Sequence, residues 1–435
     1  MVHFGYQKCL DSPSMLYDDI DSYYCSILDT MKQANADSFL KQLAELHQKL
    51  KTEPCTEKQG QILKELCFLP HNTGKDSGQA SRKKLISEAV KCYLHDTVSH
   101  CLAKYVEEGL FDSCSASNAF LWGVRVIINF GNISSYPTEF AKSAGQNTII
   151  GTALTVLGSS DNKQLRENGN EDVDQVLKDL LNLMHCLSRV SENRNFIRDA
   201  NGVDILSAYL SFKDDKYMQA RALMVLANIV DENEASQLEN DNGSILLLVQ
   251  LLKEALADEK HCYTWTKGNL KYTLYVKDLM VCLEKVSVVD ENKVRIVNAG
   301  ALPILDRVLH GGTDFDKMLA AKTIWSLCFN QECRNSVIES SLQSTLEKYA
   351  TDENSELRKE VKGALWKINE TEHVDRPVSR SGNKKGHVML SYSWSQQKLL
   401  QDVNKALWAN GYDIWMDVEQ MSGKIGLIHH YCFNG

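Results

Sequence analysis

The chain has 435 residues and a mass of 49.1 kDa, a length that predicts two or three domains or one elongated array of repeats. Apolar residues make up 43% of it and charged residues 24%, which excludes a mainly disordered chain. With 48 basic against 57 acidic residues, the formal net charge of -9 has the wrong sign for a protein held to nucleic acid, so no nucleic-acid partner is expected.

The amino-terminal region carries no recognisable targeting or anchoring signal. Its first residues lack the basic and apolar regions of a signal peptide, and Val2 stands where N-myristoylation requires glycine. The longest apolar run, residues 245–252, is much shorter than a membrane span. The 13 cysteines are scattered and include no CxxC pair, which is typical of buried thiols in a reducing compartment. These features predict a cytoplasmic protein with no membrane partner.

Helical periodicity dominates from about residue 30 to residue 370, and the whole chain holds only 6 prolines that could interrupt it. Similar short segments ending in glycine recur within this region, at Gly145, Gly202, Gly243 and Gly300. Their separations by subtraction are 57, 41 and 57 residues, which indicates a period of about 41 with polar insertions at 159–174 and 258–272. The pattern predicts an all-α solenoid whose insertions are loops on one face.

The repeated segments carry recognisable patterns. Long helices end in an Ala/Leu-rich signature, and residues 292–305 read Asn-Lys-x-x-Ile-x-x-Ala-Gly-x-x-Pro-x-Leu. In that segment we expect Gly300 to end one helix in a left-handed turn and Pro303 to begin the next. The patterns resemble the armadillo repeat over residues 115–370, which implies an armadillo-type α-solenoid with a peptide-binding groove. Residues 1–114 are predicted to be a helical region with degenerate repeats or a cap.

Alignment of the repeats places one side chain of each at the same helix position, which lines the groove in armadillo proteins. These groove residues are Asn129, Arg189, Asn228, Lys285, Ser326 and Lys367. Three of the six are cationic, which favours a protein partner with an acidic or phosphorylated peptide, or a phosphate-bearing ligand. The alternative is a solvated helix face on which Lys and Arg stems cover apolar neighbours, and the residues alone leave both possibilities open.

The composition changes after the helical region. Residues 371–386 are polar and lack a helical stripe, which predicts a linker. Beyond it we expect a strand at 387–392, an amphipathic helix at 395–410 and a second strand at 412–417. This order predicts a parallel strand pair from a doubly wound α/β sheet.

Residues 387–435 resemble the opening third of a TIR domain, so the whole chain resembles the animal proteins that combine armadillo repeats with a TIR domain. The boxes that carry the resemblance contain Ser391, Tyr392, Trp394, Trp415, Asp417, Ser422 and Gly423. The resemblance implies a partial flavodoxin-like fragment, contacts with other TIR domains and, by family resemblance alone, NAD as a cofactor. Only about 50 residues follow Gly386 and the last acidic residue is Glu419, so the catalytic glutamate of NAD-cleaving members has no counterpart.

Two functions follow from these resemblances. The first is a cytosolic interaction scaffold or adaptor in TIR-type signal transduction, in innate immunity or stress. The alternative is an armadillo-regulated TIR NAD glycohydrolase whose catalytic part is missing from this chain or present only in a longer isoform. The missing glutamate favours the scaffold, so we expect no catalytic residues and no cofactor in a truncated isoform. His429, His430 and Cys432 lack a fourth ligand, and no metal site is expected.

Overall fold

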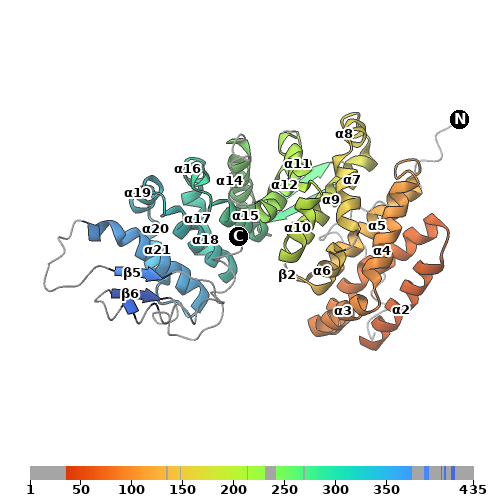
Figure 1. Cartoon of the computed structure of the whole chain (residues 1–435), viewed down its shortest axis with the longest axis horizontal. Coiled ribbons are helices and arrows are strands. Elements are labelled where there is room, and N and C mark those ends of the chain that lie inside the picture. Colours follow the sequence, from red (N-terminus) through yellow and green to blue (C-terminus); the bar gives the residue numbers. More distant parts are fainter. Residues whose placement is uncertain are drawn as a thin grey trace. The chain divides into compact units, whose positions relative to one another are not determined.

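The computed structural model describes residues 36–133, 136–146, 148–212, 214–230, 242–267, 270–374, 387–390, 403, 406–407 and 413–416. Contacts divide the chain into two units, Met1–Ile368 and Asn369–Gly435. The first unit consists mainly of packed helices, and the second contains a pair of short strands (Figure 1).

Short segments connect most of the helices in the helical unit. Its first half contains α2 (Ala36–Thr52), α3 (Thr56–Lys91), α4 (Leu94–Glu107), α5 (Cys114–Gly131), α6 (Glu139–Gly145), α7 (Ile149–Gly158), α8 (Ser160–Glu167), α9 (Glu171–Ser188), α10 (Ser191–Asp199), α11 (Gly202–Ser207), the 3-10 helix η1 (Ala208–Ser211) and α12 (Lys216–Ile229). Between α5 and α6, strands β1 (Asn132–Ile133) and β2 (Tyr136–Pro137) pair antiparallel.

The second half of the unit also consists mainly of helices. It contains α14 (Asn242–Ala257), strands β3 (Cys262–Lys267) and β4 (Leu270–Tyr275), then α15 (Val276–Val286), α16 (Asp290–Asn298), α17 (Ala301–Gly311), α18 (Asp314–Leu327), α19 (Gln331–Glu339), α20 (Leu342–Tyr349) and α21 (Ser355–Val374). Helix α21 continues past Ile368, where the first unit ends.

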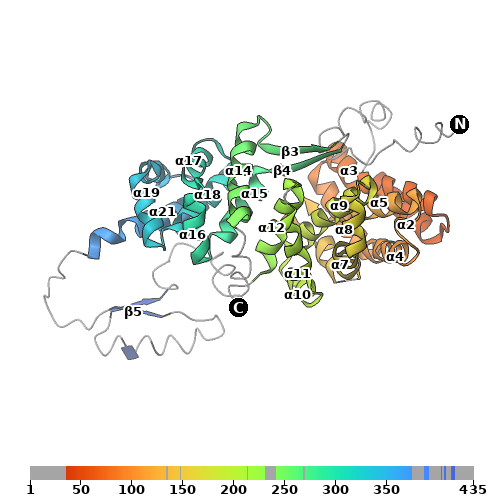
Figure 2. The same cartoon turned by 90° about the horizontal axis from the view of Figure 1, so that it is seen from above.

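Long helices that follow one another along the chain pack directly together. In order, α3 contacts α5, α5 contacts α9, α9 contacts α12, α12 contacts α15, and α15 contacts α18. The intervening helices form further rows, in which α7 contacts α11, α14 contacts α17, α17 contacts α20, and α16 contacts α19 (Figures 1 and 2). One continuous apolar core runs from Phe39 in α2 to Ile368 in α21. The predicted all-α solenoid is therefore confirmed.

Several helices begin at a residue whose side chain accepts a hydrogen bond from the first turn. Ser113 caps α5, Asn170 caps α9 and Asp215 caps α12 in this way. Thr313 and Asp316 form a capping box at the start of α18. Each of these caps satisfies backbone N–H groups that the helix itself cannot pair, which fixes where the long helix of a repeat starts.

The left-handed turn that joins two helices of a repeat is confirmed at Gly300, where φ is +83° between α16 and α17. In the earlier repeat the corresponding left-handed residue is Asn201, with φ of +60°, and Gly202 is the first residue of α11. The glycine spacing therefore aligned this repeat one residue too late. Asparagine tolerates this conformation better than most residues, which explains the exchange.

The prediction that both polar insertions are loops is wrong. The first insertion contains helix α8. The second forms an antiparallel hairpin in which Thr264 pairs with Thr273 and Trp265 pairs with Tyr272. Figure 2 shows this β3–β4 hairpin extending from the region of α14 and α15 toward α3. The hairpin brings residues of the second half of the unit to helices of the first half.

The second unit contains β5 (His387–Leu390) and β6 (Asp413–Met416), which pair in parallel with Val388 opposite Ile414. These strands lie within the two predicted strand segments. Residues 371–374 belong to α21, so the linker was predicted to begin too early, and residues 375–386 lie outside the described residues. Of the predicted intervening helix, residues 403, 406 and 407 are described, and they are helical.

Candidate ligand-binding site

The three neutral groove residues form hydrogen bonds between neighbouring repeats. Asn129 Nδ2 donates to the carbonyl oxygen of Cys67 at 2.9 Å, from α5 to α3. Asn228 Nδ2 donates to Ser188 Oγ at 2.9 Å, from α12 to α9. Ser326 Oγ donates to the carbonyl oxygen of Ser287 at 2.8 Å, from α18 to the end of α15. These side chains therefore join each long helix to the preceding one, a role that the alignment did not anticipate.

Two of the three cationic groove residues lie at helix ends, and the third lies within a helix. Arg189 follows the last residue of α9, Lys285 is in the last turn of α15, and Lys367 is on α21. Burial lowers the pKa of Lys285 to about 8, and the charge of Arg194 acts in the same direction. The Lys367 ammonium lies 4.8 Å from the ring centre of Phe329. A lysine that titrates near pH 8 is a chemically distinct group on this surface.

We define the cationic stripe as these three basic side chains and two basic neighbours, namely Arg189, Arg194, Lys285, Lys322 and Lys367. Arg194 Nε donates to the carbonyl oxygen of Ser188 at 3.2 Å, which holds it beside the end of α9. Lys322 forms an ion pair with Glu284 at 2.8 Å. Lys322 is therefore paired with a carboxylate of the neighbouring helix α15.

A cavity of about 350 Å³ opens among α3, α5, α9, α12 and the segment from β4 into α15. Two groove residues, Asn129 and Arg189, line it. Its basic side chains are Arg82, Arg125, Arg189, Arg221 and Lys277. Its acidic side chains are Asp179 and Asp278. Its larger rings are those of Phe68, Trp122, Tyr217, Tyr272 and Tyr275. Five cations, two carboxylates and several rings make this wall suited to an anionic ligand with a flat, apolar portion.

A buried ion pair forms one side of the cavity. Arg125 Nε and Nη2 both lie 2.8 Å from Asp179 Oδ2. Burial raises the pKa of Asp179, while the charge of Arg125 opposes that rise. The Arg125 guanidinium also lies 5.2 Å from the ring centre of Trp122. The pair fixes a guanidinium and an indole next to each other at the cavity wall.

Arg221 attaches the hairpin to the helices around the cavity. Its Nη2 donates to the carbonyl oxygen of Thr273 at 3.1 Å, and its Nε donates to the hydroxyl of Tyr217 at 3.2 Å. Its Nη1 donates to His185 Nδ1 at 3.0 Å. Burial, followed by the charge of Arg221, holds the pKa of His185 well below its ordinary value, so this imidazole is neutral and accepts the hydrogen bond.

Tyr272 presents an unsatisfied hydroxyl at the cavity wall. The side chain is 1% exposed, and its hydroxyl has no hydrogen-bond partner among the residues that the structure describes. Burial raises the pKa of this phenol well above its ordinary value, so it is neutral and can donate. Buried hydroxyls in proteins are nearly always paired, and a ligand atom in the cavity would supply the missing partner.

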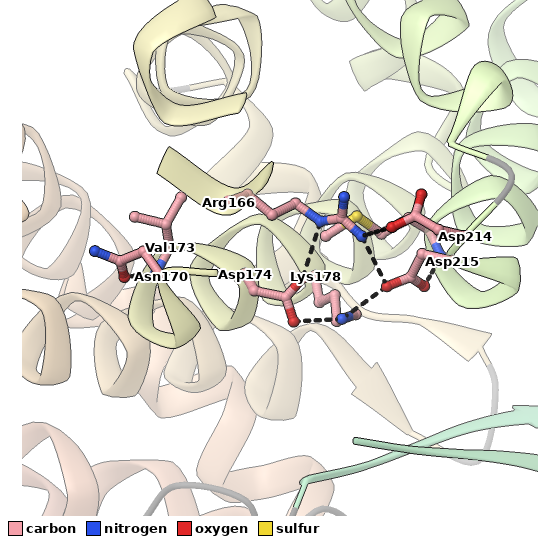
Figure 3. A network of polar contacts seen from close by, with 8 residues as sticks. Arg166, Asn170, Val173, Asp174, Lys178, Asp214 and Asp215 are labelled. Atoms are coloured by element: carbon pink, nitrogen blue, oxygen red, sulfur yellow. Dashed lines mark hydrogen bonds and ion pairs between the residues drawn. The ribbon is translucent and has the colours of Figure 1, made fainter. Parts of the chain in front are cut away.

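A second polar network joins charged side chains of α8, α9 and the start of α12 (Figure 3). Lys178 Nζ lies 2.6 Å from Asp174 Oδ2 and 2.8 Å from Asp215 Oδ2, and all three side chains are buried. Arg166 contacts the same two carboxylates at 2.9 and 3.3 Å. The Lys178 ammonium also lies 4.1 Å from the ring centre of Trp265 on β3. This network joins α8, α9, the start of α12 and the hairpin.

The sequence analysis did not predict the cavity residues within 272–278, because it assigned residues 258–272 to a loop. Among the residues of the TIR-like boxes, only Trp415 falls within the described chain, where it belongs to the backbone of β6. Ser391, Tyr392, Trp394, Asp417, Ser422 and Gly423 lie outside the described residues. In the described part of the chain, no group of three or more His, Cys, Asp and Glu side chains is placed to hold a metal ion.

Comparison with known proteins returns designed repeat proteins among solved structures. No protein-family model and no curated protein matches this chain. The designed armadillo repeat protein YIII(Dq)4CqI is 18% identical, with a TM-score of 0.44 over 62% of this chain and 100% of its own. An engineered protein from a structural genomics consortium is 21% identical, with a TM-score of 0.43 over 62% of this chain and 96% of its own.

A designed armadillo repeat protein in complex with the peptide (KR)4 gives 18% identity and a TM-score of 0.41, over 62% of this chain and 99% of its own. All three TM-scores are below 0.5, and we therefore base no argument on these similarities. The helical repeat of this chain is shown by the contacts between its own helices. Among the described residues, no helix is both long enough and apolar enough to cross a membrane.

Proposed function

We propose that the helical unit is an armadillo-type interaction scaffold that binds a phosphate-bearing or acidic ligand. The charge of the cavity is the observation that supports this most, because five basic side chains line it against two acidic ones. Asp179 is already paired with Arg125, which leaves the remaining cations in excess over Asp278. Charge-assisted hydrogen bonds from Arg and Lys are the usual means by which proteins hold phosphates and carboxylates.

The shape of the cavity favours a phosphate-bearing metabolite at this position. A volume of about 350 Å³ is within the range of small-molecule sites, and the ring of Trp122 next to Arg125 suits a flat heterocycle beside a phosphate. The cationic stripe extends beyond the cavity and suits an acidic or phosphorylated protein segment. The proposed scaffold therefore takes a small anion in the cavity and an extended partner along the stripe.

The carboxy-terminal unit has a separate proposed role. The parallel pairing of β5 and β6 supports a TIR-like fragment that contacts complete TIR domains and links the scaffold to TIR-type signalling. The cavity is also compatible with the alternative function, an armadillo-regulated TIR NAD glycohydrolase. In a longer isoform, a phosphate-bearing metabolite bound in the cavity would then regulate that activity. Pull-down with a complete TIR domain tests the first role, and loss of capture after deletion of residues 387–435 is the expected result.

The ligand proposal is tested by calorimetric titration of the full chain with NAD-related nucleotides and with acidic peptides. Lys277→Glu should weaken nucleotide binding by roughly tenfold or more, because a charge-assisted hydrogen bond becomes a repulsion. Lys348→Glu, which reverses an exposed lysine on α20 outside the cavity, should leave the affinity unchanged. Equal affinities for wild type and both variants would reject the cavity as the site.

A further inference from the structure

The middle of the cationic stripe contains two basic side chains, Arg189 and Lys285, that are partly removed from water. Arg189 and Lys285 form no ion pair with any residue that the structure describes, although both side chains are half-buried. The charge of Arg194 adds to theirs, because it lowers the pKa of Lys285. Partly desolvated cations without partners are unfavourable, so an anionic group from elsewhere is expected on this surface.

The chain itself contains a segment of opposite charge. Residues 11–30, which lie outside the described residues, include five aspartates and no Lys, Arg or His. The aspartates are Asp11, Asp18, Asp19, Asp21 and Asp29. The segment also contains Tyr17, Tyr23 and Tyr24 among aliphatic residues, so it combines negative charge with aromatic rings. This composition complements a surface that is both cationic and aromatic.

The far end of the cationic stripe has such aromatic character. Phe329 is 54% exposed and Trp366 is 62% exposed, which is unusual for side chains of this size. The Lys367 ammonium lies over both rings, at 4.8 and 5.7 Å from their centres. Exposed aromatic groups beside a cation mark a surface for a partner that brings apolar and acidic side chains together.

We infer that the amino-terminal segment 11–30 of the same chain occupies the cationic stripe and thereby competes with acidic partners. This inference rests on the proposed function, since it names an occupant for part of the same surface. The aspartates would pair with Arg189 and Lys285, and Tyr17, which precedes Asp18 and has more chain before α2, would cover Phe329 and Trp366. An external acidic partner must then displace the segment, which makes the scaffold self-regulated.

The length of the chain allows this contact. Asp21 precedes Ala36, the first residue of α2, by 15 residues, and an extended chain of that length reaches roughly 50 Å. From α2, five successive helix contacts lead through α3, α5, α9 and α12 to α15. Packed helices lie about 8–10 Å apart, so the helix axes along this path cover roughly 40–50 Å. A segment extended from α2 to Asp21 therefore spans the separation of the axes of α2 and α15, and the earlier aspartates have additional length with which to reach Lys285.

Carbodiimide coupling of the full chain tests the contact directly, because it joins a carboxylate to an amine only when the two touch. The expected products join Asp18, Asp19 or Asp21 to Lys285, and their yield within monomers is independent of protein concentration. Coupling of Lys285 to residues 231–241, a second acidic stretch, would overturn the inference. So would coupling that appears only in dimers, which would assign the segment to a second copy, or no coupling of Lys285 at all.

A competition measurement provides the second arm, with a decamer of glutamate as the probe. The full-chain variant Asp18→Lys/Asp19→Lys/Asp21→Lys should bind the probe about tenfold more tightly than wild type, since an intramolecular competitor is removed. The matched control reverses three exposed acidic residues on other elements, as Glu167→Lys/Glu171→Lys/Glu259→Lys, and should leave the affinity unchanged. Equal affinity of the aspartate variant and wild type would overturn the inference.

The variant Lys285→Glu separates this inference from the proposed function. If it abolishes probe binding while the aspartate variant behaves like wild type, the stripe binds acidic ligands and the inference about segment 11–30 fails. If it leaves probe binding unchanged in both backgrounds, the stripe is not the site for acidic ligands. The proposed function then fails at the stripe, and the cavity titration with nucleotides stands independently.

Discussion

Lys178 illustrates how single charged residues stabilise this helical unit. Its ammonium is fully buried, contacts Asp174 and Asp215, and lies under the indole of Trp265. Two carboxylates, which it shares with Arg166, and a ring compensate this cation. The half-buried Lys285 on α15 forms no ion pair with a carboxylate among the described residues. The same residue type thus serves structure at one position and remains available to a ligand at the other.

Removal of the buried ammonium should strongly destabilise the unit. Lys178→Met leaves Asp174 and Asp215 with less compensation in the interior, and we expect a loss of about 3–5 kcal/mol in the free energy of unfolding. Denaturation by urea, followed by circular dichroism, measures the effect. Lys41→Met removes an exposed ion pair with Glu45 and should cost less than about 1 kcal/mol. Similar losses for both variants would show that the network contributes little.

The pH dependence of ligand binding should report Lys285. Because burial lowers its pKa from 10.5 to about 8, the ammonium is present below pH 8 and is lost as the pH rises through that value. Affinity for an acidic peptide should therefore decrease between pH 7 and 9 in wild type. The variant Lys285→Arg keeps its charge and should show a much smaller decrease in the same titration. A wild-type affinity that is constant over this range would contradict the assignment.

At the scale of elements, the β3–β4 hairpin is the main departure from a simple helical repeat. Its strands carry Trp265 against Lys178, Thr273 against Arg221 and Tyr272 against the ring of Tyr217. The hairpin leads directly into α15, which carries Lys285. Helix α15 therefore contributes residues to both the cavity and the stripe. Because the hairpin leads directly into this helix, a change in the hairpin should affect both.

Loss of the indole on β3 should loosen the hairpin without unfolding the helices. Trp265→Ala removes a cation–π contact with a buried ammonium, and such a contact contributes about 2 kcal/mol to stability. Hydrogen exchange at the strand amides of 262–266 and 271–275 should become faster by roughly one order of magnitude. Trp366→Ala, which removes an exposed indole, serves as the control and should leave these amides unaffected. Unchanged exchange in Trp265→Ala would show that the contact between Lys178 and Trp265 contributes little to the stability of the hairpin.

The helices and their repetition were predictable because the apolar spacing is local information. The hairpin also carried a signal, since the aromatic and β-branched residues of 263–266 and 272–275 flank a Gly-Asn pair at 268–269, a typical two-residue turn. The hairpin was nevertheless missed, because residues 258–272 were interpreted as a polar loop. The cavity could not be predicted, because Arg125 and Asp179 meet only through the packing of α5 on α9. Likewise, the role of Asn228 depends on a hydrogen bond to the neighbouring repeat. The spacing of residues along the sequence does not predict this bond.

At the scale of the whole molecule, the two units differ in how much structure supports them. The helical unit has a continuous core, whereas β5 and β6 contribute four residues each to one parallel pair. Two short strands rarely form a stable sheet by themselves. The carboxy-terminal unit is therefore the part of the chain that should depend most on a partner.

Hydrogen exchange of the full chain should reveal this difference. We expect amides of residues 387–390 to exchange much faster than those of 223–229 in α12, because fewer contacts protect them. Addition of a complete TIR domain should slow exchange at 387–390 if the proposed contact forms. In the same preparation NAD should remain intact, which chromatography of the nucleotide would verify. Protection of β5 equal to that of α12, or turnover of NAD, would contradict this view of the unit.

The contacts of the hairpin also determine how the helical unit should respond to mechanical force. The side-chain bonds of Asn129, Asn228 and Ser326 connect only neighbouring repeats, so a chain pulled from its ends should yield repeat by repeat. Each rupture would release about 41 to 57 residues, or roughly 14 to 19 nm of extended chain. The contact between Lys178 and Trp265 spans 87 residues, so the repeats between them should give way together in one longer step of about 30 nm.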